Sequence, residues 1–501
     1  MPSTARIIRE NPAALGLGAL NALLFALAAP HYPGSIALYG FFTCCASYML
    51  WFGLTQNLGF GQKVLAVFLW LGIFFKLAAH LIFRYPYVEP VGGFAYTPKQ
   101  YNEVLIVGIA AYAGVCAAWQ LASRHINSER TDPLTLPTTT AGSKSNMGTA
   151  PLLAAFIALV VIINALNIHF GIFRVGIVAK TILPWPTNAV LSWLLGVGLS
   201  FGAAVLVLSG CLSRKKISWC LGAVIFEGIL SGATTLSRGL YLWHVFPVFW
   251  AVWMNRKRLG AALPFRRLIL ISIIAAAGFV ATGAAANLAR NRDYSSALRG
   301  SAGDQSAVPA VGLKYAHPPR TPAAHIAALE TAAAQLTHLA ADRWIGLEGI
   351  MVAVGYSKKS VGLFKELLEE KSAIGRVTRY QFIANAVGYM HMDANKFQFG
   401  TLPGPAGFFY LSGSLFFVFA GMMIVVLFGA LLEHWVFVMT RNPFLYAVIA
   451  VWVANTIAQM GVAPRMVGKP LFMNAAAVLL IAFVQSRWWG IGWFGHEDRG
   501  R

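Results

Sequence analysis

Hydrophobic residues occur in long, continuous runs along this chain, and polar residues are concentrated between the runs. The runs are about twenty residues long and lack the alternation of polar and apolar positions that is typical of barrel strands. Isolated membrane spans are helices by default, because each must satisfy its own backbone polar groups. The pattern predicts an all-α polytopic membrane protein with about twelve transmembrane helices, over residues 13–30, 35–54, 63–83, 103–121, 150–168, 188–209, 218–236, 239–254, 268–288, 405–430, 443–462 and 470–486.

One long polar interval separates the predicted spans into two groups. We expect a first membrane domain over residues 1–288, with nine spans, and a second over residues 405–501, with three. The interval 289–404 begins with a loop rich in Gly, Ser and Pro and continues with stretches of helical period, whose apolar stripe includes Leu336 and Ile350. This interval predicts a large periplasmic loop with amphipathic helices, which form a helical cap over the membrane domain.

Composition agrees with this class of protein. Hydrophobic residues make up 57% of the 501 residues and charged residues 11%, whereas soluble proteins carry about 25% charged residues. The net charge of +21 fits the positive-inside rule and affinity for anionic membrane lipids, and it also fits an anionic substrate. Nucleic acid is not an expected partner, because the basic residues are scattered among loops and form no separate basic domain.

Basic residues also indicate an orientation. With the N-terminus inside, the cytoplasmic segments hold more than twice as many basic residues as the short outside loops, and both termini are then cytoplasmic. The stretches RKK at 214–216 and NRKRLGAALPFRR at 255–267 contribute most. The N-terminal region, with Arg6, Arg9 and an apolar stretch, resembles a signal peptide. We interpret it as an uncleaved first span, since the topology closes without removing it.

Five cysteines are present, and each falls within a predicted span or near its cytoplasmic end. No disulfide framework and no exposed catalytic thiol is therefore indicated. Buried cysteines in such positions are usually packing residues.

Three basic residues, Lys76, His80 and Arg84, are spaced four apart at the outer end of the third predicted span. On a helix this spacing places all three side chains on one face. One interpretation is snorkelling, in which the long side chains extend toward the membrane surface. The other is that this face lines a polar cavity, since charged groups inside a membrane are costly and usually functional. Three cations near the outer leaflet then favour a lipid-linked phosphate or diphosphate as the ligand.

Further cations lie in the outside segments. Arg238 and Arg465 lie in short outside turns, where arginine runs against the positive-inside bias. Arg343 occupies a position at which the apolar stripe of the loop predicts a hydrophobic residue. The structural alternative is an interfacial anchor for Arg238 and an ion pair with Glu348 or Asp342 for Arg343.

The choice of a general base stays open at this level. Glu348, Glu89, His391 and His80 are all available for proton transfer. Glu227 lies inside the seventh predicted span, where it either pairs with a cation across the bundle, such as Lys76, or carries protons.

Several motifs are absent from the sequence. It contains no Walker motif, no H-E-x-x-H, no Asp-x-Asp pair and no obvious metal-ligand spacing. We therefore expect no metal ion and no other cofactor, and we do not expect an ATPase, a zinc protease or a metal-assisted nucleotide-sugar enzyme.

The chain resembles the O-antigen (oligosaccharide repeat-unit) polymerases and the related O-antigen ligase-like glycosyltransferases of Gram-negative inner membranes. The resemblance covers the architecture, with about a dozen spans and one dominant outside loop in the C-terminal half. Locally it is carried by LSRGLYL at 236–242, DRWIGLEGIMV at 342–352 and TLPGPAGFFYLSGSLFFVF at 401–419.

The resemblance implies a metal-independent inverting glycosyltransferase in the bacterial inner membrane. Such an enzyme transfers a glycan from undecaprenyl diphosphate to the next lipid-linked repeat unit on the periplasmic side. The expected partners are the lipid-linked oligosaccharide and a chain-length regulator protein. The implied site has two sets of residues. The catalytic set is Glu348, His391 and Glu89. The diphosphate-binding set is Arg343, Arg238, Lys76, His80, Arg84 and Arg465.

Two other classes remain as alternatives. A flippase or transporter of lipid-linked saccharide would distribute charged residues through the membrane depth and break helices at matched positions in two halves. An exosortase-like membrane protease would need an outside-facing cysteine, and the topology predicts none.

Overall fold

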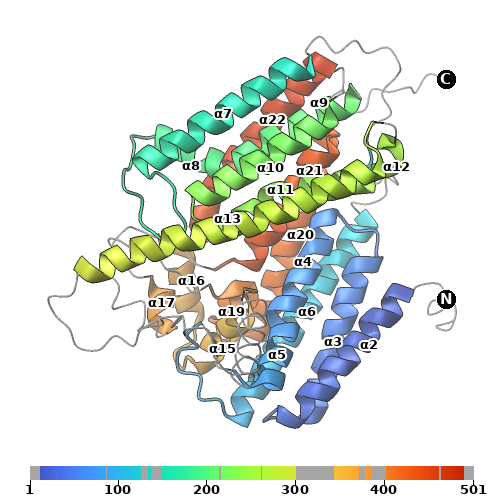
Figure 1. Ribbon diagram of the computed structural model, residues 1–501. Helices are drawn as coiled ribbons and strands as arrows, with labels where there is room; N and C mark the ends of the chain where they lie inside the picture. The colour runs from blue at the N-terminus through green and yellow to red at the C-terminus, as the bar shows by residue number, and fades with distance from the viewer. Residues whose placement is uncertain are drawn as a thin grey trace, which may run out of the picture.

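Helices of the computed structural model are tilted in roughly the same direction and pack side by side (Figure 1). The start of α2, the α12 turn and the end of α22 lie toward the right of this view, whereas α15, α16 and α17 lie toward the lower left. Both ends of the described chain therefore lie on one face of the bundle. The structure describes residues 12–85, 87, 89–125, 134–136, 148–213, 216–260, 262–300, 343–371, 378–384, 402–461 and 464–489.

The N-terminal group of helices contains one long composite helix. Phe60–Phe83 runs for 24 residues without interruption, and its central part, η2, is wound as a π-helix. Arg84 ends it by adopting a left-handed conformation, with a φ of 53°. The helices of this group are α2 (Pro12–Ala28), η1 (Ala29–His31), α3 (Ile36–Thr55), α4 (Phe60–Leu69), η2 (Trp70–Phe75), α5 (Lys76–Phe83) and α6 (Pro98–His125).

The middle group contains two irregular helices. A π-helical segment, η3, joins α8 to α9, and Pro247 lies inside α11. The helices of this group are α7 (Thr149–Phe170), α8 (Thr187–Trp193), η3 (Leu194–Gly198), α9 (Leu199–Leu212), α10 (Ile217–Thr234), α11 (Arg238–Met254), α12 (Arg256–Leu259) and α13 (Phe265–Gly300).

The C-terminal helices hold the other two groups together. The helix α20 packs along α6, while α21 packs against α4 on one side and α11 on the other. The helices of this part are α15 (Leu347–Gly355), α16 (Val361–Glu369), α17 (Arg379–Ile383), α19 (Gly404–Tyr410), α20 (Leu415–Thr440), α21 (Pro443–Ala458), η4 (Pro464–Val467) and α22 (Gly468–Trp489).

The all-helical prediction is confirmed for the part of the chain that the structure describes. The predicted spans 13–30 and 443–462 coincide with shorter apolar helices, and 239–254 coincides with the 17-residue α11. Twelve membrane crossings thus stay a prediction. Within the described residues nine helices are long and apolar enough to cross a membrane, namely Ile36–Thr55, Phe60–Phe83, Pro98–Arg124, Thr149–Phe170, Thr187–Leu212, Ile217–Thr234, Phe265–Ala289, Leu415–Thr440 and Gly468–Trp489.

The predicted start of the tenth span, at 405, is wrong. A turn at residues 411–414 separates the short α19 from α20, and the long helix begins only at Leu415. Ser412, Gly413 and Ser414 mark this break, because Ser and Gly favour turns, but the search for long apolar runs passed over these three residues.

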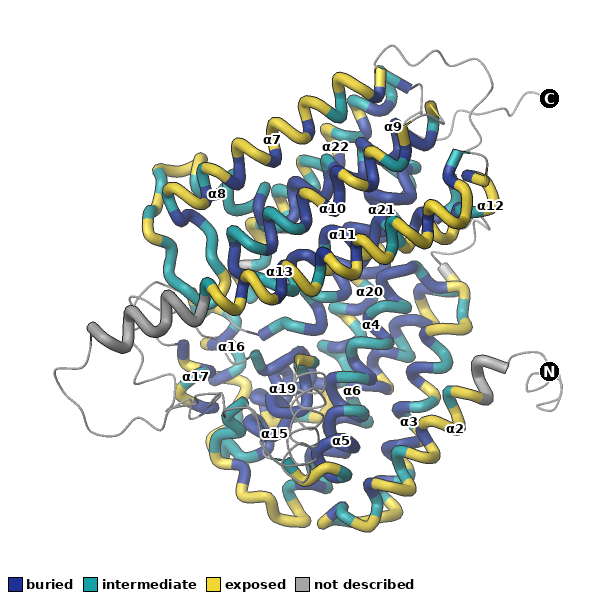
Figure 2. Tube along the Cα trace, viewed as in Figure 1, coloured by how far each residue is buried: buried dark blue, intermediate teal, exposed yellow. Residues whose placement is uncertain are grey.

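The segment that begins at Arg343 does not have the amphipathic character expected of a cap. All residues from Leu347 to Val354 are buried, because α15 packs against α6, α19 and η2. Figure 2 shows α15 and α19 as dark blue, buried segments, whereas α7 and α13 carry exposed residues along much of their length. Within the described part of this interval, α16 has the expected surface character, with Leu363 and Leu367 buried beneath exposed charged residues.

The two short helices α15 and α19 begin at the same depth. A Cβ on Gly72, midway along the composite helix, would lie 2.1 Å from the Ile345 carbonyl oxygen, so the chain before α15 passes directly across η2. Gly404, at the start of α19, lies against Gly346 in the same way. At a rise of 1.5 Å per residue this point is about 16 Å from the end of the composite helix at Phe83.

Glycines permit α15 and α19 to touch along their backbones. A Cβ on Gly349 would lie 1.7 Å from the Pro403 carbonyl oxygen, and one on Gly407 would lie 2.4 Å from the Gly349 carbonyl carbon. At the far end of α15, Gly355 lies against Gly93 and Phe94 of the loop between α5 and α6. The two short helices therefore run in parallel, from the middle of the bundle toward that loop.

Candidate functional site

A buried ion pair joins the composite helix to α15. The Lys76 ammonium contacts Glu348 Oε1, with only 1% of the Lys76 side chain and 6% of the Glu348 side chain exposed. Lys76 also donates a hydrogen bond to the Trp344 carbonyl oxygen over 2.9 Å. Residues 344–348, which enter the bundle, thus supply these two partners of the lysine.

His80 lies one turn further along the same face as Lys76 and is also buried. Its Nδ1 atom donates to the Tyr85 carbonyl oxygen at 3.0 Å, since a carbonyl oxygen can only accept. The imidazole ring stacks on Tyr87, with ring centroids 3.9 Å apart, and contacts Tyr85 at 4.2 Å. The residues after the helix therefore fold back over the histidine.

Arg84, which the sequence places in one row with Lys76 and His80, does not share their face of the helix. Arg84 ends α5 in a left-handed conformation, which turns its side chain away from the face that carries Lys76 and His80. Its exposed guanidinium contacts His31 Nδ1 of η1 at 2.8 Å. The prediction of a basic row of three is therefore wrong at Arg84, because a helix terminus is invisible in the four-residue spacing.

Glu89 brings a second carboxylate to the pair. Its side chain is half-buried, and its Oε2 atom is fully buried without a hydrogen-bond partner among the described residues. Burial raises the pKa of the Glu89 carboxyl, and the charge of Glu348 raises it further, while the cations Lys76 and Arg343 lower it. Two carboxylates and two cations thus interact across this region.

Arg343 lies in the turn before α15, and its side chain is exposed. The predicted seven-residue stripe through Arg343 and Ile350 is wrong, because the helix begins only at Leu347. Among the described residues, Lys76 is the partner of Glu348 at ion-pair distance, so the alternative of an Arg343–Glu348 ion pair is also not observed. The arginine instead stands at the exposed edge of the cluster, near Glu89.

Tyr380 was not singled out from the sequence. Burial raises its pKa, and the charges of Glu348 and Glu89 add to this effect, so the phenol is within electrostatic range of the same carboxylates. A backbone hydrogen bond from Gly92 to Ala384 holds α17 against the loop that carries Glu89. A lone tyrosine in a polar segment offers no signal by which the sequence could have assigned it here.

The other predicted phosphate-binding residues make their contacts elsewhere. Arg238 begins α11, and the aliphatic part of its side chain lies against Gly283 of α13. Arg465 is exposed in η4, a segment that packs near α16. His391 lies outside the described residues. The cluster therefore contains Lys76, His80, Glu89, Arg343 and Glu348 of the predicted set.

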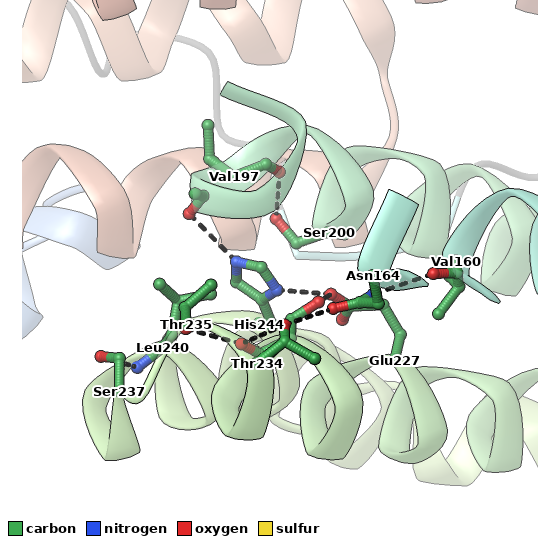
Figure 3. A network of polar contacts seen from close by, with 12 residues as sticks. Val160, Asn164, Val197, Ser200, Glu227, Thr234, Thr235, Ser237, Leu240 and His244 are labelled. Atoms are coloured by element: carbon green, nitrogen blue, oxygen red, sulfur yellow. Dashed lines mark hydrogen bonds and ion pairs between the residues drawn. The ribbon is translucent and has the colours of Figure 1, made fainter. Parts of the chain in front are cut away.

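A second buried acid is paired with a histidine (Figure 3). Glu227 Oε1 lies 2.7 Å from His244 Nδ1, and Ser231 donates to the same oxygen over 2.8 Å. The expected alternative partner, Lys76, is instead bound to Glu348. Sequence reasoning missed His244, because it lies in an otherwise apolar run and has no companion at ligand spacing.

A third buried acid, Glu433, lies in α20. It accepts hydrogen bonds from Gln62 at 2.7 Å, from the Gly61 backbone at 3.0 Å and from Tyr446 at 3.1 Å. Gln62 in turn accepts from Trp119 over 2.9 Å. Both carboxylate oxygens are satisfied, which makes this network a structural connection between α4, α6, α20 and α21. Across the described ranges, no group of three or more His, Cys, Asp or Glu side chains is placed to hold a metal ion.

Comparison with known proteins gives no relative: no family model, no curated protein and no solved structure matches the chain. The resemblance to the O-antigen polymerases thus rests on the segments quoted above. Two of these, from Arg343 and from Leu402 onward, build the α15 and α19 pair beside the ion pair. The third forms the turn from α10 into α11.

Proposed function

We propose that this protein is an inner-membrane glycosyltransferase that polymerises or transfers undecaprenyl-diphosphate-linked oligosaccharide units on the periplasmic side. One observation supports this more than any other, namely the cluster in which Lys76, Arg343, Glu89 and Glu348 interact where α15 meets the composite helix and the loop after α5. In a site from which water is largely excluded, a carboxylate can accept a proton and a cation can stabilise the charge of a phosphate leaving group.

The reaction assigns one role to each kind of group. An acceptor hydroxyl attacks the anomeric carbon of the lipid-linked sugar, a new C–O bond forms, and the bond from that carbon to the diphosphate oxygen breaks. The diphosphate leaves with the electron pair, and the exposed Arg343 guanidinium stabilises its growing charge. The hydroxyl proton passes to a carboxylate, and attack opposite the leaving group inverts the configuration.

Glu89 is the strongest candidate for the proton acceptor. Glu348 is occupied by Lys76, and His80 already donates through Nδ1 to a backbone carbonyl and is enclosed by tyrosine rings. Glu89 keeps one buried oxygen without a hydrogen-bond partner among the described residues. The raised pKa of its carboxyl also makes it a stronger base than an ordinary glutamate.

Deletion of the gene in the bacterium from which it comes tests the proposal. We expect surface polysaccharide to be reduced to single repeat units, and the wild-type gene to restore long chains. The Glu89→Gln variant, confirmed to be present in the membrane at the wild-type level, should fail to restore them. Unchanged polysaccharide chain lengths in the deletion strain would rule out a polymerase function for this protein.

A second candidate function has its own supporting observation. Buried acids occur at several places in the helical bundle, with Glu348, Glu227 and Glu433 on three different helices. The short helices α15 and α19 also begin midway through the bundle, as broken helices of transporters do. A flippase for lipid-linked saccharide would leave the precursor on the cytoplasmic leaflet of the deletion strain, whereas a polymerase would leave it on the periplasmic leaflet.

A further inference from the structure

The Glu227–His244 pair is enclosed on all sides by helices. Glu227 is 0% exposed and His244 1% exposed. The pair lies between α10 and α11, and α7, α9, α13 and α21 pack against these two helices. Figure 3 shows the imidazole ring between the Glu227 carboxylate on one side and the helix segment that carries Val197 on the other.

Hydrogen-bond chemistry fixes the protons of this histidine. His244 Nε2 lies 3.0 Å from the Gly196 carbonyl oxygen, which can only accept, so Nε2 carries a hydrogen. The Nδ1–Oε1 contact of 2.7 Å needs one further proton between its two atoms, since two lone pairs would repel. The pair therefore holds one shared proton and is neutral as a unit, whichever atom carries that proton.

The neighbouring groups leave room for a change of protonation. Glu227 Oε2 is buried and has no hydrogen-bond partner within the described part of the chain. Thr234 and Asn164 bond to each other at 2.7 Å, and the titratable Tyr241 donates to the Ala275 carbonyl over 2.6 Å. Among the described residues, Glu227 is the charged group that acts on His244.

Two backbone irregularities lie beside the pair. The π-helical η3 contains Gly196, and such bulges often occur at functional sites. Pro247 lies three residues after His244 in α11, where a proline removes one helical hydrogen bond and permits a bend. The Gly196 carbonyl oxygen orients the histidine, and α11 carries it. Both can therefore shift.

We propose that the Glu227–His244 pair is a proton-binding site whose occupancy controls the bend of α11 at Pro247. On release, the shared proton passes to a water molecule and forms hydronium. A neutral imidazole, protonated at Nε2, is then left with its Nδ1 lone pair facing the carboxylate. Repulsion between them breaks the contact between α10 and α11, and uptake of a proton from hydronium restores it.

Contacts connect this bend with the candidate site. Trp243, beside His244, packs edge-on against Phe68 with ring centroids 5.7 Å apart. Phe68 also contacts Trp344 at 5.5 Å, and the Trp344 carbonyl accepts from Lys76. A shift of α11 thus reaches the residues before α15. The proton site does not depend on the proposed glycosyl transfer.

The test is nitrogen-15 NMR of the full chain, labelled at histidine and reconstituted in lipid nanodiscs. Spectra are recorded over a pH series from about 4 to about 10, which covers the ordinary pKa values of carboxyl and imidazole groups. We expect the His244 Nδ1 resonance to move through one transition while Nε2 stays protonated. The His244→Gln variant assigns the signals by their disappearance.

The Glu227→Gln variant separates a proton site from a structural pair. Its amide group donates to Nδ1 and keeps the contact, but it carries no acid proton, so the transition should be absent. Thr234→Val alters the adjacent hydrogen bond without touching an acid and should keep the transition. The protection factors of the α11 amides, from which the intrinsic rise of exchange with pH has been removed, should fall on the high-pH side of the transition in the wild type and not in Glu227→Gln.

Constant His244 resonances over the whole series would overturn the proposal, because they would mark a sealed structural pair. A transition without any change in the protection factors of the α11 amides would overturn the link to the bend. The wild-type series alone decides the first point if Glu227→Gln does not fold.

Discussion

Lys76 and Glu348 form an ion pair in which both side chains are almost completely buried, at 1% and 6% exposed. The pair connects the middle of the bundle to a segment that enters it from the long loop between α13 and α20. Removing two charges from water is costly, so the pair must be completed by further hydrogen bonds, and the Trp344 carbonyl provides one.

Lys76→Met should destabilise the protein by about 3–5 kcal/mol, because it leaves the Glu348 carboxylate buried without a counter-charge. The double variant Lys76→Met, Glu348→Gln should lose much less, since it removes both charges. Thermal unfolding in detergent, followed by size-exclusion chromatography, measures the difference. A loss in the double variant equal to the sum of the losses in Lys76→Met and Glu348→Gln would mean that the two residues act independently.

Arg343→Ala should lower glycan transfer by roughly 10²-fold, as expected for the loss of one donor to a developing negative charge. Expression and folding should stay normal, because the side chain is exposed. Arg84→Ala is the matched control: this arginine is also exposed but contacts His31, and its loss should leave transfer near the wild-type level. A comparable loss of glycan transfer in both variants would mean that transfer depends on the general positive charge of the surface and not on Arg343 in particular.

Arg238→Ala examines the one predicted site arginine that begins α11. If the substrate extends from the cluster to this helix, the variant loses transfer at normal expression. The measurement is again the chain length of surface polysaccharide after complementation. Wild-type chain lengths would leave Arg238 as an anchor against Gly283 of α13.

Transfer should fall on acidification at a higher pH than an ordinary glutamate would produce. Glu89 acts as a base only when ionised, and burial and the charge of Glu348 raise its pKa. Arg343→Ala should move this acidic limb to still higher pH, because Arg343 lowers the pKa of Glu89. A pH–rate profile of both proteins on a purified lipid-linked substrate checks the shift. If the acidic limb of the profile lies at the same pH in both proteins, Glu89 is not the base whose titration limits transfer.

Gly349→Ala should prevent α15 from packing against the chain at Pro403. The added Cβ would lie 1.7 Å from a backbone oxygen, and we expect a loss of at least about 3 kcal/mol. Gly362→Ala is the control, because this glycine is exposed in α16 and has only the Ser360 hydroxyl oxygen near it, at 3.7 Å. It should gain about 0.5–1 kcal/mol of stability. Thermal unfolding of the two purified variants decides between these outcomes.

Much of the fold follows from the hydrophobic pattern, and its failures have physical causes. The apolar runs predict helices correctly because each span must bury its own backbone bonds. The turn at residues 411–414 is marked by Ser412, Gly413 and Ser414, which a search for long apolar runs passes over. The burial of α15 could not be predicted in this way, because a short apolar helix inside the bundle has the same composition as part of a span. Contacts between glycine backbones decide its position, and they leave no periodic signal.

The candidate site was partly predictable. Lys76, His80, Glu89, Arg343 and Glu348 were named because charge at the edge of a membrane span is costly and therefore informative. Their pairing was not predictable, since it depends on how deeply the segment at 344–348 enters. Glu227 was also named because a charge inside a membrane span is costly. Its partner, His244, could be identified only from the structure.

The start of α15 and α19 midway through the bundle has a consequence for the biogenesis of the protein. Helices of nine and seven residues are too short to be threaded individually across a lipid bilayer by an insertion machinery, which selects segments of about twenty apolar residues. Both must therefore enter the bundle from the far side, after the helices on either side have been inserted. Maturation should then end with a docking step in which the Lys76–Glu348 contact closes.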